Sequence, residues 1–258
     1  KITQKTKAIL PVHLYGQLCD MEVIRYIARE HNLFVIEDSA HCVEGRRADY
    51  QPGTLGDVAC FSFYAIKNIT SGEGGALATN SRKLAEKVKM LRNHGMSNQA
   101  SDRYGGKFQH WDMIDLGWKY SMSNIQASLL LPQLERIDER LRRREEICKR
   151  YESELENFEG VELLKVVQES KSARHLFTIL VDADKRDRIL QKFQDKEIGV
   201  AVNFRAVHLL DYYKSKYDFK RGDFPHAESM GDRTITLPLY PKLTDEEVEY
   251  VIQTVKEV

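Results

Sequence analysis

The sequence predicts an α/β fold with a mostly parallel sheet in its first half and a smaller α+β domain in its second half. A strand–helix–strand pattern within residues 8–36 supports the first prediction, together with continuous apolar runs of the kind that parallel sheets bury on both faces. A changed pattern of segments after Gly160 supports the second. We therefore expect two domains, 1–131 and 132–258.

The first half opens with an apolar run at residues 8–12, which predicts a strand. Asp20 then opens a helix. Its apolar residues follow the 3.6-residue repeat of one helix face: Val23, Ile24, Ile27 and Ala28. The next strand, 33–36, ends in Glu37-Asp38. The remaining elements of this half are strands at 58–63 and 75–79 and a helix at 81–92.

Residues 95–120 contain Gly105-Gly106 and show no period, so they predict a long loop. A helix resumes near Ser123, and Pro132 either kinks it or starts a new one. A highly charged helix follows, to about Glu156. The second half adds strands at 176–181, 200–204 and 234–237, a helix at 185–196, and a final helix after the capping box that Thr244 begins.

Composition excludes two classes of function for this chain of 258 residues. Lysine plus arginine and aspartate plus glutamate number 39 each, and a net charge of zero argues against a general nucleic-acid binder. No apolar run approaches the roughly 20 residues that a membrane helix needs. The cysteines form no C-x-x-C pair, so we expect no metal site and a reduced, cytoplasmic location. They are Cys19, Cys42, Cys60 and Cys148.

Asp38 follows the apolar run 33–36 directly and is the first candidate for chemistry. Functional carboxylates of α/β proteins often lie just past the C-terminal end of a strand, where the crevice of the sheet opens. An acid there needs a cationic or hydrogen-bonding partner, because its desolvation is otherwise uncompensated. The alternative is that Asp38 caps the following turn through its side chain.

Lys67 is the second candidate, because it lies between an apolar strand and a glycine-rich loop. Desolvation there lowers the pKa of an amine toward the neutral form that attacks carbonyl groups. Ser62 supplies a hydroxyl group on the same strand, and the glycines of the loop permit a close approach of the backbone. The alternative is an ordinary surface lysine.

Together these residues suggest the chemistry of pyridoxal phosphate. That cofactor requires a lysine for covalent attachment, an acid beside its pyridinium nitrogen and donors for its phosphate. Six stretches then follow in order: PVHLYGQ (11–17), EDSAH (37–41), FSFYAIKN (61–68), GEGG (72–75), LRNHG (91–95) and LPLYP (237–241). With them the chain resembles, over essentially its whole length, the nucleotide-sugar aminotransferases of the DegT/StrS group.

The resemblance implies fold type I of the pyridoxal phosphate enzymes, a three-layer, mostly parallel sheet of the aspartate aminotransferase type. It also implies that a further N-terminal portion, with the turn that cups the phosphate, precedes the strand 8–12. We therefore expect residues 1–131 to be a partial cofactor-binding domain and 132–258 to be the small C-terminal domain.

The same resemblance assigns roles to single residues. Lys67 would be the catalytic lysine that binds the cofactor covalently, and Asp38 would pair with the pyridine nitrogen. His41 would lie near the phenolic oxygen of the ring, and Ser62 would bind the phosphate. A buried histidine with a purely structural role is the alternative for His41.

A closer similarity is to the branch that makes UDP-4-amino-4-deoxy-L-arabinose, on the segments AIKNIT (65–70), GWKY (117–120) and NFRAVH (203–208). Arg205 and His208 are the candidates for substrate contact, with ordinary surface residues as the alternative. Relatives carry an asparagine that reaches the neighbouring subunit's cofactor, and the matching positions here hold Lys119 and Ser121.

The implied function is transfer of an amino group from glutamate to a nucleotide-linked keto sugar, at C4, by a homodimer with its site at the interface. No nucleic-acid or membrane partner is expected. Two alternatives stay open. One is a non-catalytic or regulatory fragment of a protein with this fold. The other is a sugar dehydratase that uses the same cofactor, in which the resemblance implies a histidine in place of Lys67.

Overall fold

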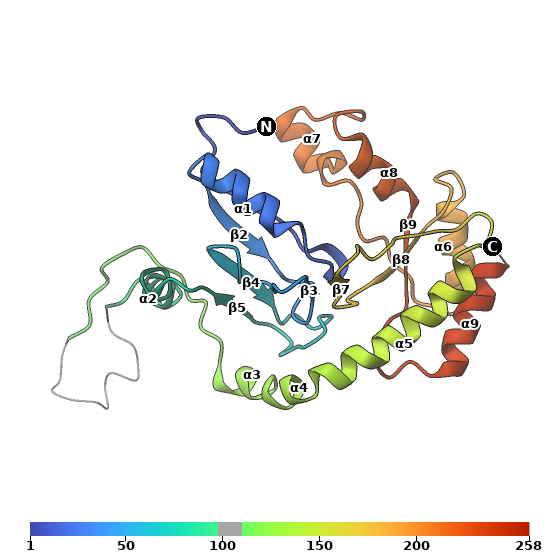
Figure 1. Ribbon diagram of the computed structural model, residues 1–258, viewed down its shortest axis with the longest axis horizontal. Coiled ribbons are helices and arrows are strands. Elements are labelled where there is room, and N and C mark those ends of the chain that lie inside the picture. The colour runs from blue at the N-terminus through green and yellow to red at the C-terminus, as the bar shows by residue number, and fades with distance from the viewer. Residues whose placement is uncertain (98–109, 258) are drawn as a thin grey trace. The chain divides into compact units, whose positions relative to one another are not determined.

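The computed structural model describes residues 1–97 and 110–257 (Figure 1). The chain divides into two compact units. The first unit comprises Lys1–Ile137 and Glu169–Ala173. The second unit comprises Asp138–Gln168 and Arg174–Val258. Each unit has its own core of buried side chains.

A four-stranded sheet forms the centre of the first unit (Figure 1). Its strands are, in spatial order, β1 (Ala8–Ile9), β2 (Phe34–Asp38), β4 (Val58–Ser62) and β5 (Gly75–Ala78). The first three are parallel, and β5 is antiparallel to β4. The predicted mostly parallel sheet is confirmed, and β1 is shorter than the apolar run that predicts it.

Helix α1 (Met21–Glu30) covers one face of this sheet. Asp20 caps it as predicted, since its side chain accepts the N–H of Val23 at 3.2 Å. The buried face differs from the predicted one, because Met21 and Ala28 are buried whereas the Val23 side chain is 54% exposed. Met21 continues the apolar stripe one turn before Ile24, and this places Val23 on the outer face.

The remaining elements of the first unit are short, apart from helix α2 (Arg82–Leu91), which starts after Ser81 as predicted. A helix resumes at Ser123 with a complete capping box, and Pro132 starts a new helix rather than kinking one. The loop predicted over 95–120 holds only isolated bridges in its described parts, and 98–109 lie outside the described residues. The other elements are η1 (Leu14–Gly16), β3 (Arg46–Arg47), α3 (Asn124–Ser128), α4 (Leu131–Glu135) and β7 (Ser170–Lys171).

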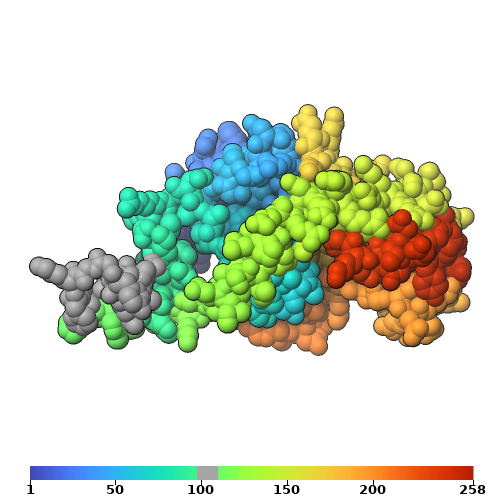
Figure 2. Space-filling view, turned by 90° about the horizontal axis from the view of Figure 1, so that it is seen from below, coloured from blue at the N-terminus to red at the C-terminus, as the bar shows by residue number. Residues whose placement is uncertain are grey.

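The second unit packs helices against an antiparallel sheet of β6 (Glu162–Leu163), β8 (Phe177–Leu180) and β9 (Thr234–Leu237). The helices α5 (Ile137–Leu155), α6 (Arg186–Asp195) and α9 (Asp245–Lys256) supply most of the remaining core. In Figure 2, α9 (red) lies along α5 (yellow-green), and ion pairs join the two helices. They are Arg143–Asp245, Arg150–Glu249 and Lys256–Glu154.

One predicted strand of the second unit is wrong. Within 200–204 only Ala201 makes a β-bridge, to Thr236, and the chain then turns away from the sheet. Three helices follow where none was predicted: η3 (Val207–Leu209), α7 (Asp211–Tyr217) and α8 (Pro225–Arg233). Glu228 of α8 accepts the N–H groups of Gly222 and Phe224, which lie in the connection between α7 and α8.

Candidate active site

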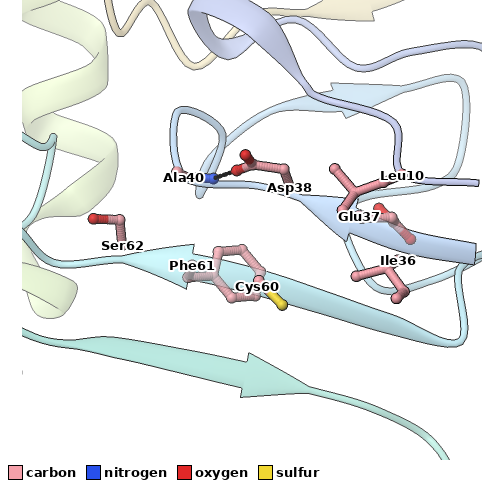
Figure 3. A pocket seen from close by; sticks show the side chains of 8 residues that line it. All are labelled: Leu10, Ile36, Glu37, Asp38, Ala40, Cys60, Phe61 and Ser62. Atoms are coloured by element: carbon pink, nitrogen blue, oxygen red, sulfur yellow. Dashed lines mark hydrogen bonds between the residues drawn. The ribbon is translucent and has the colours of Figure 1, made fainter. Parts of the chain in front are cut away.

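A pocket of about 290 Å³ lies at the C-terminal ends of β2 and β4 (Figure 3). Asp38 and Cys60 are direct partners in the parallel register. Because side chains alternate along a strand, Asp38, Cys60 and Ser62 face the same side of the sheet. Leu10, Ile36 and Phe61 supply large apolar side chains to the lining of the pocket. The crevice that the sequence predicts at the end of the parallel strands is therefore present.

Asp38 caps a turn, as the alternative predicts, and it also lines the pocket. Its Oδ1 accepts the backbone N–H of Ala40 at 3.0 Å (Figure 3). Among the described residues, no group donates a hydrogen bond to Oδ2. One carboxylate oxygen thus fixes the side chain, and the other can accept a proton donor from a ligand.

His41 is a neutral hydrogen-bond donor in this site. Burial and then the positive charge of Lys67 lower the pKa of His41 to about 4, against the opposing effect of Asp38. The backbone N–H of Tyr15 donates to Nδ1 of His41 at 3.3 Å. Nδ1 therefore carries a lone pair, and the ring proton is on Nε2.

Lys67 lies in the connection from β4 to β5, where its own N–H donates to the carbonyl of Tyr64 at 3.0 Å. Partial burial lowers the pKa of Lys67, and the carboxylate of Asp38 acts in the opposite direction. The amine makes no hydrogen bond or ion pair within the ranges 1–97 and 110–257. The positive charge of Lys67 also lowers the pKa of His41. The charges of Lys67, Asp38 and His41 therefore influence one another.

The connection that carries Lys67 is held by side chains on either side of it. Asn68 donates from Nδ2 to Glu44 at 3.0 Å and to the carbonyl of Ala173 at 2.9 Å. Gln133 bonds both the N–H and the carbonyl of Thr70, at 3.1 and 2.7 Å. These contacts fix the backbone next to Lys67, so the lysine extends from an ordered segment.

Gly74 completes this connection. Its φ of +151° disfavours any side chain, and an added Cβ would lie 2.7 Å from Cε of Met122 and 2.8 Å from Oγ of Ser71. The predicted need for glycine is therefore real at this position.

Ser62 ends β4 and is one of the residues that line the pocket. Its Oγ accepts the N–H of Tyr64 at 3.3 Å. The hydroxyl proton stays available for a second partner, which suits the oxygen of a phosphate.

The two candidate substrate residues belong to the second unit. Arg205 is exposed. His208 is 8% exposed, and its Nε2 lies 2.9 Å from Oε1 of Glu228. The rings of Phe219 and Phe224 meet the His208 ring edge-on. His208 therefore occupies a packed position rather than an open surface.

Lys119 and Ser121 lie on an exposed segment of the first unit. Lys119 forms an isolated bridge with Asn93, and the Ser121 hydroxyl donates to the carbonyl of Arg92 at 3.5 Å. No group of three or more metal-binding side chains occurs among the described residues. In the same residues, no helix is long and apolar enough to cross a membrane.

Three residues around the site were not singled out from the sequence: Tyr15, His13 and Glu37. Tyr15 has a positive φ of +58° and presents its N–H to His41. His13 and Glu37 are buried and bonded to each other at 2.8 Å. For Glu37, the sequence does contain a signal. Because side chains alternate along a strand, Glu37 must face the side of the sheet opposite to Asp38.

The donor set fits pyridoxal phosphate. The site offers an uncommitted amine, a carboxylate with one oxygen open, a neutral imidazole N–H and a hydroxyl proton. These match the four needs of the cofactor, namely covalent attachment, a partner for the ring nitrogen, a donor to the ring oxygen and a donor to the phosphate. Fold and site together define a pyridoxal phosphate-dependent enzyme of the α/β class.

Comparison with known proteins identifies the family. The model of the DegT/DnrJ/EryC1/StrS aminotransferase family matches residues 1–256, and the chain belongs to this family. An uncharacterised protein of Methanocaldococcus jannaschii, MJ1066, is 42% identical over the whole of this chain. The spore coat polysaccharide biosynthesis protein SpsC of Bacillus subtilis is 39% identical over the whole chain. The chain spans about two thirds of each relative, 68% of its length.

A solved structure agrees with this assignment. The putative sugar aminotransferase Spr1654 of Streptococcus pneumoniae, in its PMP form, superimposes with a TM-score of 0.91 at 30% identity. The match covers 99% of this chain and 70% of that one. The predicted fold type, the cofactor and the class of enzyme, a pyridoxal phosphate-dependent sugar aminotransferase, are confirmed.

Proposed function

We propose that Lys67, Asp38, His41 and Ser62 form the cofactor site of this aminotransferase. We further propose that the enzyme moves an amino group from glutamate to C4 of a nucleotide-linked keto sugar. The observation that supports the site most directly is the electrostatic coupling of Lys67 with both Asp38 and His41 at the end of the parallel strands. Such a group of perturbed side chains beside a pocket is typical of a catalytic centre.

Each residue has a distinct task toward the cofactor. Oδ2 of Asp38 would accept a hydrogen bond from the protonated ring nitrogen, while Oδ1 keeps its hydrogen bond from the N–H of Ala40. His41 would donate from Nε2 to the ring oxygen, and Ser62 would donate to the phosphate. Bound pyridoxal phosphate supplies an electron-withdrawing ring that stabilises negative charge on the reacting carbon of the substrate.

Lys67 would serve as the base and acid of the reaction. Burial lowers the pKa of its amine, which raises the neutral fraction able to take a proton from the substrate carbon. The nearby carboxylate of Asp38 favours the protonated form that returns the proton. Burial and the Asp38 carboxylate thus act on Nζ in opposite directions.

The substrate class rests on the relatives and on the second unit. One relative is named for polysaccharide biosynthesis and one structural neighbour as a sugar aminotransferase. The exposed guanidinium of Arg205 suits the phosphates of a nucleotide-linked sugar. His208 would support that contact by holding the segment 203–208 to Glu228. The C4 position rests on His41 and on the resemblance of the segment 203–208.

The test is a transamination assay with the full-length protein that contains this chain. A panel of UDP- and dTDP-linked 4-keto and 3-keto sugars is combined with glutamate and with alternative amino donors. We expect turnover with a 4-keto sugar and glutamate. Turnover with 3-keto sugars only would refute the C4 assignment, and turnover with free keto sugars alone would refute the nucleotide-linked substrate. Sedimentation of the same protein tests the proposed homodimer.

A further inference from the structure

A buried polar pair lies directly behind Asp38. Glu37 precedes it on β2, and because strand side chains alternate, Glu37 points to the opposite face of the sheet. Both Glu37 and its partner His13 are 0% exposed. Nε2 of His13 and Oε2 of Glu37 are 2.8 Å apart. Glu37 is also among the residues that line the pocket, whereas His13 is not (Figure 3).

The Glu37 carboxylate has a complete set of donors. Oε2 also accepts the N–H of Gly53 at 3.1 Å, and Oε1 accepts the N–H of Gly56 at 2.8 Å. A Cβ on Gly56 would lie 2.4 Å from Oε1, so this close approach requires glycine. A buried carboxylate is costly unless it is paired in this way. Glu37 therefore ties β2 to the loop that leads into β4.

The His13 ring links this carboxylate to the turn before α1. Burial lowers the pKa of His13, but the side chains of Cys19 and Glu37 raise it by more, to about 9. Nδ1 of the ring lies 3.2 Å from the backbone nitrogen of Cys19, just before the cap residue of α1. On the other side of the ring, Nε2 carries a proton and donates a hydrogen bond to Glu37.

The His13 backbone holds Asp38 itself. The His13 N–H donates to the Asp38 carbonyl at 3.0 Å, and the Asp38 N–H donates to the Pro11 carbonyl at 2.9 Å. His13 thus bonds two successive residues of β2, Glu37 through its side chain and Asp38 through its main chain. Any shift of the His13–Glu37 pair moves the peptide from which the Asp38 carboxylate extends.

We propose that His13 and Glu37 are positioning residues that hold the Asp38 carboxylate in place for the cofactor without touching it. The inference rests on the proposed role of Asp38 toward the ring nitrogen. Loss of the pair leaves buried donors unsatisfied and lets the end of β2 relax, so Oδ2 no longer meets the ring in a fixed geometry.

Two substitutions of His13 make a matched pair for the test. In His13→Gln, the side-chain amide reaches the place of Nε2 and keeps a donor to Glu37. In His13→Asn, the shorter side chain keeps an acceptor near Cys19 and loses that donor. Glu37→Gln is the second variant that breaks the pair, since it keeps the volume and places an amide group among N–H donors.

The measurement is made on the full-length apoenzyme, titrated with pyridoxal phosphate and followed by visible absorbance. We expect His13→Asn and Glu37→Gln to weaken the dissociation constant about tenfold and His13→Gln to stay within about threefold of wild type. The pH at which the visible absorbance of the loaded protein changes should shift in the same two variants. Unfolding of each apoenzyme is recorded beside these values.

A double-mutant cycle with Asp38→Asn separates positioning from plain stability. If the pair acts through Asp38, His13→Asn adds no further loss of affinity in the Asp38→Asn background. Additive losses, or variants that lower only the unfolding midpoint, would overturn the inference and leave the proposed function standing. An unchanged affinity in Asp38→Asn alone would instead refute the role of Asp38, and with it the inference.

Discussion

Tyr15 donates its backbone N–H to Nδ1 of His41 across 3.3 Å, from a residue whose φ of +58° lies in the left-handed region. That contact makes Nδ1 of His41 an acceptor, so the ring proton is on Nε2. The backbone of one residue thus fixes the tautomer of a ring 26 residues later in the chain.

The first prediction concerns the donor at position 41. His41→Gln keeps an N–H donor and should hold the affinity for pyridoxal phosphate within about tenfold, whereas His41→Leu should lose more. Titration of the full-length apoenzyme with the cofactor measures both. Equal affinities in the glutamine and leucine variants would contradict a donor role.

The second prediction is a pH dependence of stability from the same residue. The folded-state pKa of His41 is about 4, below its usual value of 6.5, so the unfolded chain binds the proton first as the pH falls. The contribution is complete above about 6.5 and is lost between there and about 4. Urea unfolding of the apoenzyme at a series of pH values should show this loss in wild type and a smaller one in His41→Gln. Identical pH profiles would refute it.

The third prediction concerns Lys67. Lys67→Ala should reduce turnover by more than about 10²-fold, because the general base and acid is removed. The visible absorbance of covalently bound cofactor should disappear with it. Lys89→Ala, on the exposed face of α2, is the matched control and should change neither. Retained turnover in Lys67→Ala would rule out the assignment of the catalytic lysine.

The fourth prediction compares two glycines of the same loop. Gly72 and Gly74 both have positive φ, +79° and +151°, but an added Cβ meets nothing within 4 Å at Gly72 and meets Met122 and Ser71 at Gly74. Gly72→Ala should cost about 1 kcal/mol of unfolding free energy through backbone strain alone. Gly74→Ala should cost more and should also weaken cofactor binding. Equal costs would show that the contacts of Gly74 do not matter.

The fifth prediction concerns Glu228 in the second unit. The N–H of Gly222, together with His208 and Phe224, lowers the pKa of Glu228 below its usual range. This stabilisation is present above the unfolded-state pKa and is lost as the pH falls through the folded-state value. Glu228→Gln should speed amide hydrogen exchange across 207–224 at neutral pH. The control is Glu249→Gln, on the exposed side of α9, and exchange as slow as in wild type would contradict the role of Glu228.

Apolar periodicity was sufficient to predict β2, β4, β9 and the capped helix α9, because each buries a regular face. The segment 203–224 was not predictable in this way. Its end is held by one carboxylate, Glu228, which accepts the N–H groups of residues six and four positions before it. Periodic apolar patterns indicate which residues are buried. They do not indicate a polar side chain that accepts hydrogen bonds from N–H groups elsewhere in the chain.

The candidate site was likewise predictable from the sequence only in part. The sequence placed Asp38, Ser62 and Lys67 at the ends of strands, and the structure brings their elements to one edge of the sheet. His13 and Glu37 were missed because they are 24 residues apart and both polar, so neither contributes to an apolar pattern. The pairing of these two side chains can be recognised only in the folded structure, where they lie next to each other.

The antiparallel pairing of β4 with β5 limits how the chain between them can vary. Register contacts join Ser62 to Gly75, so both ends of the connection that carries Lys67 are fixed to each other. An inserted or deleted residue there cannot be absorbed by sliding β5, because a slip of one residue turns its side chains to the other face. A change of length must therefore be taken up within residues 63–74, where it alters the path of the backbone that carries Lys67.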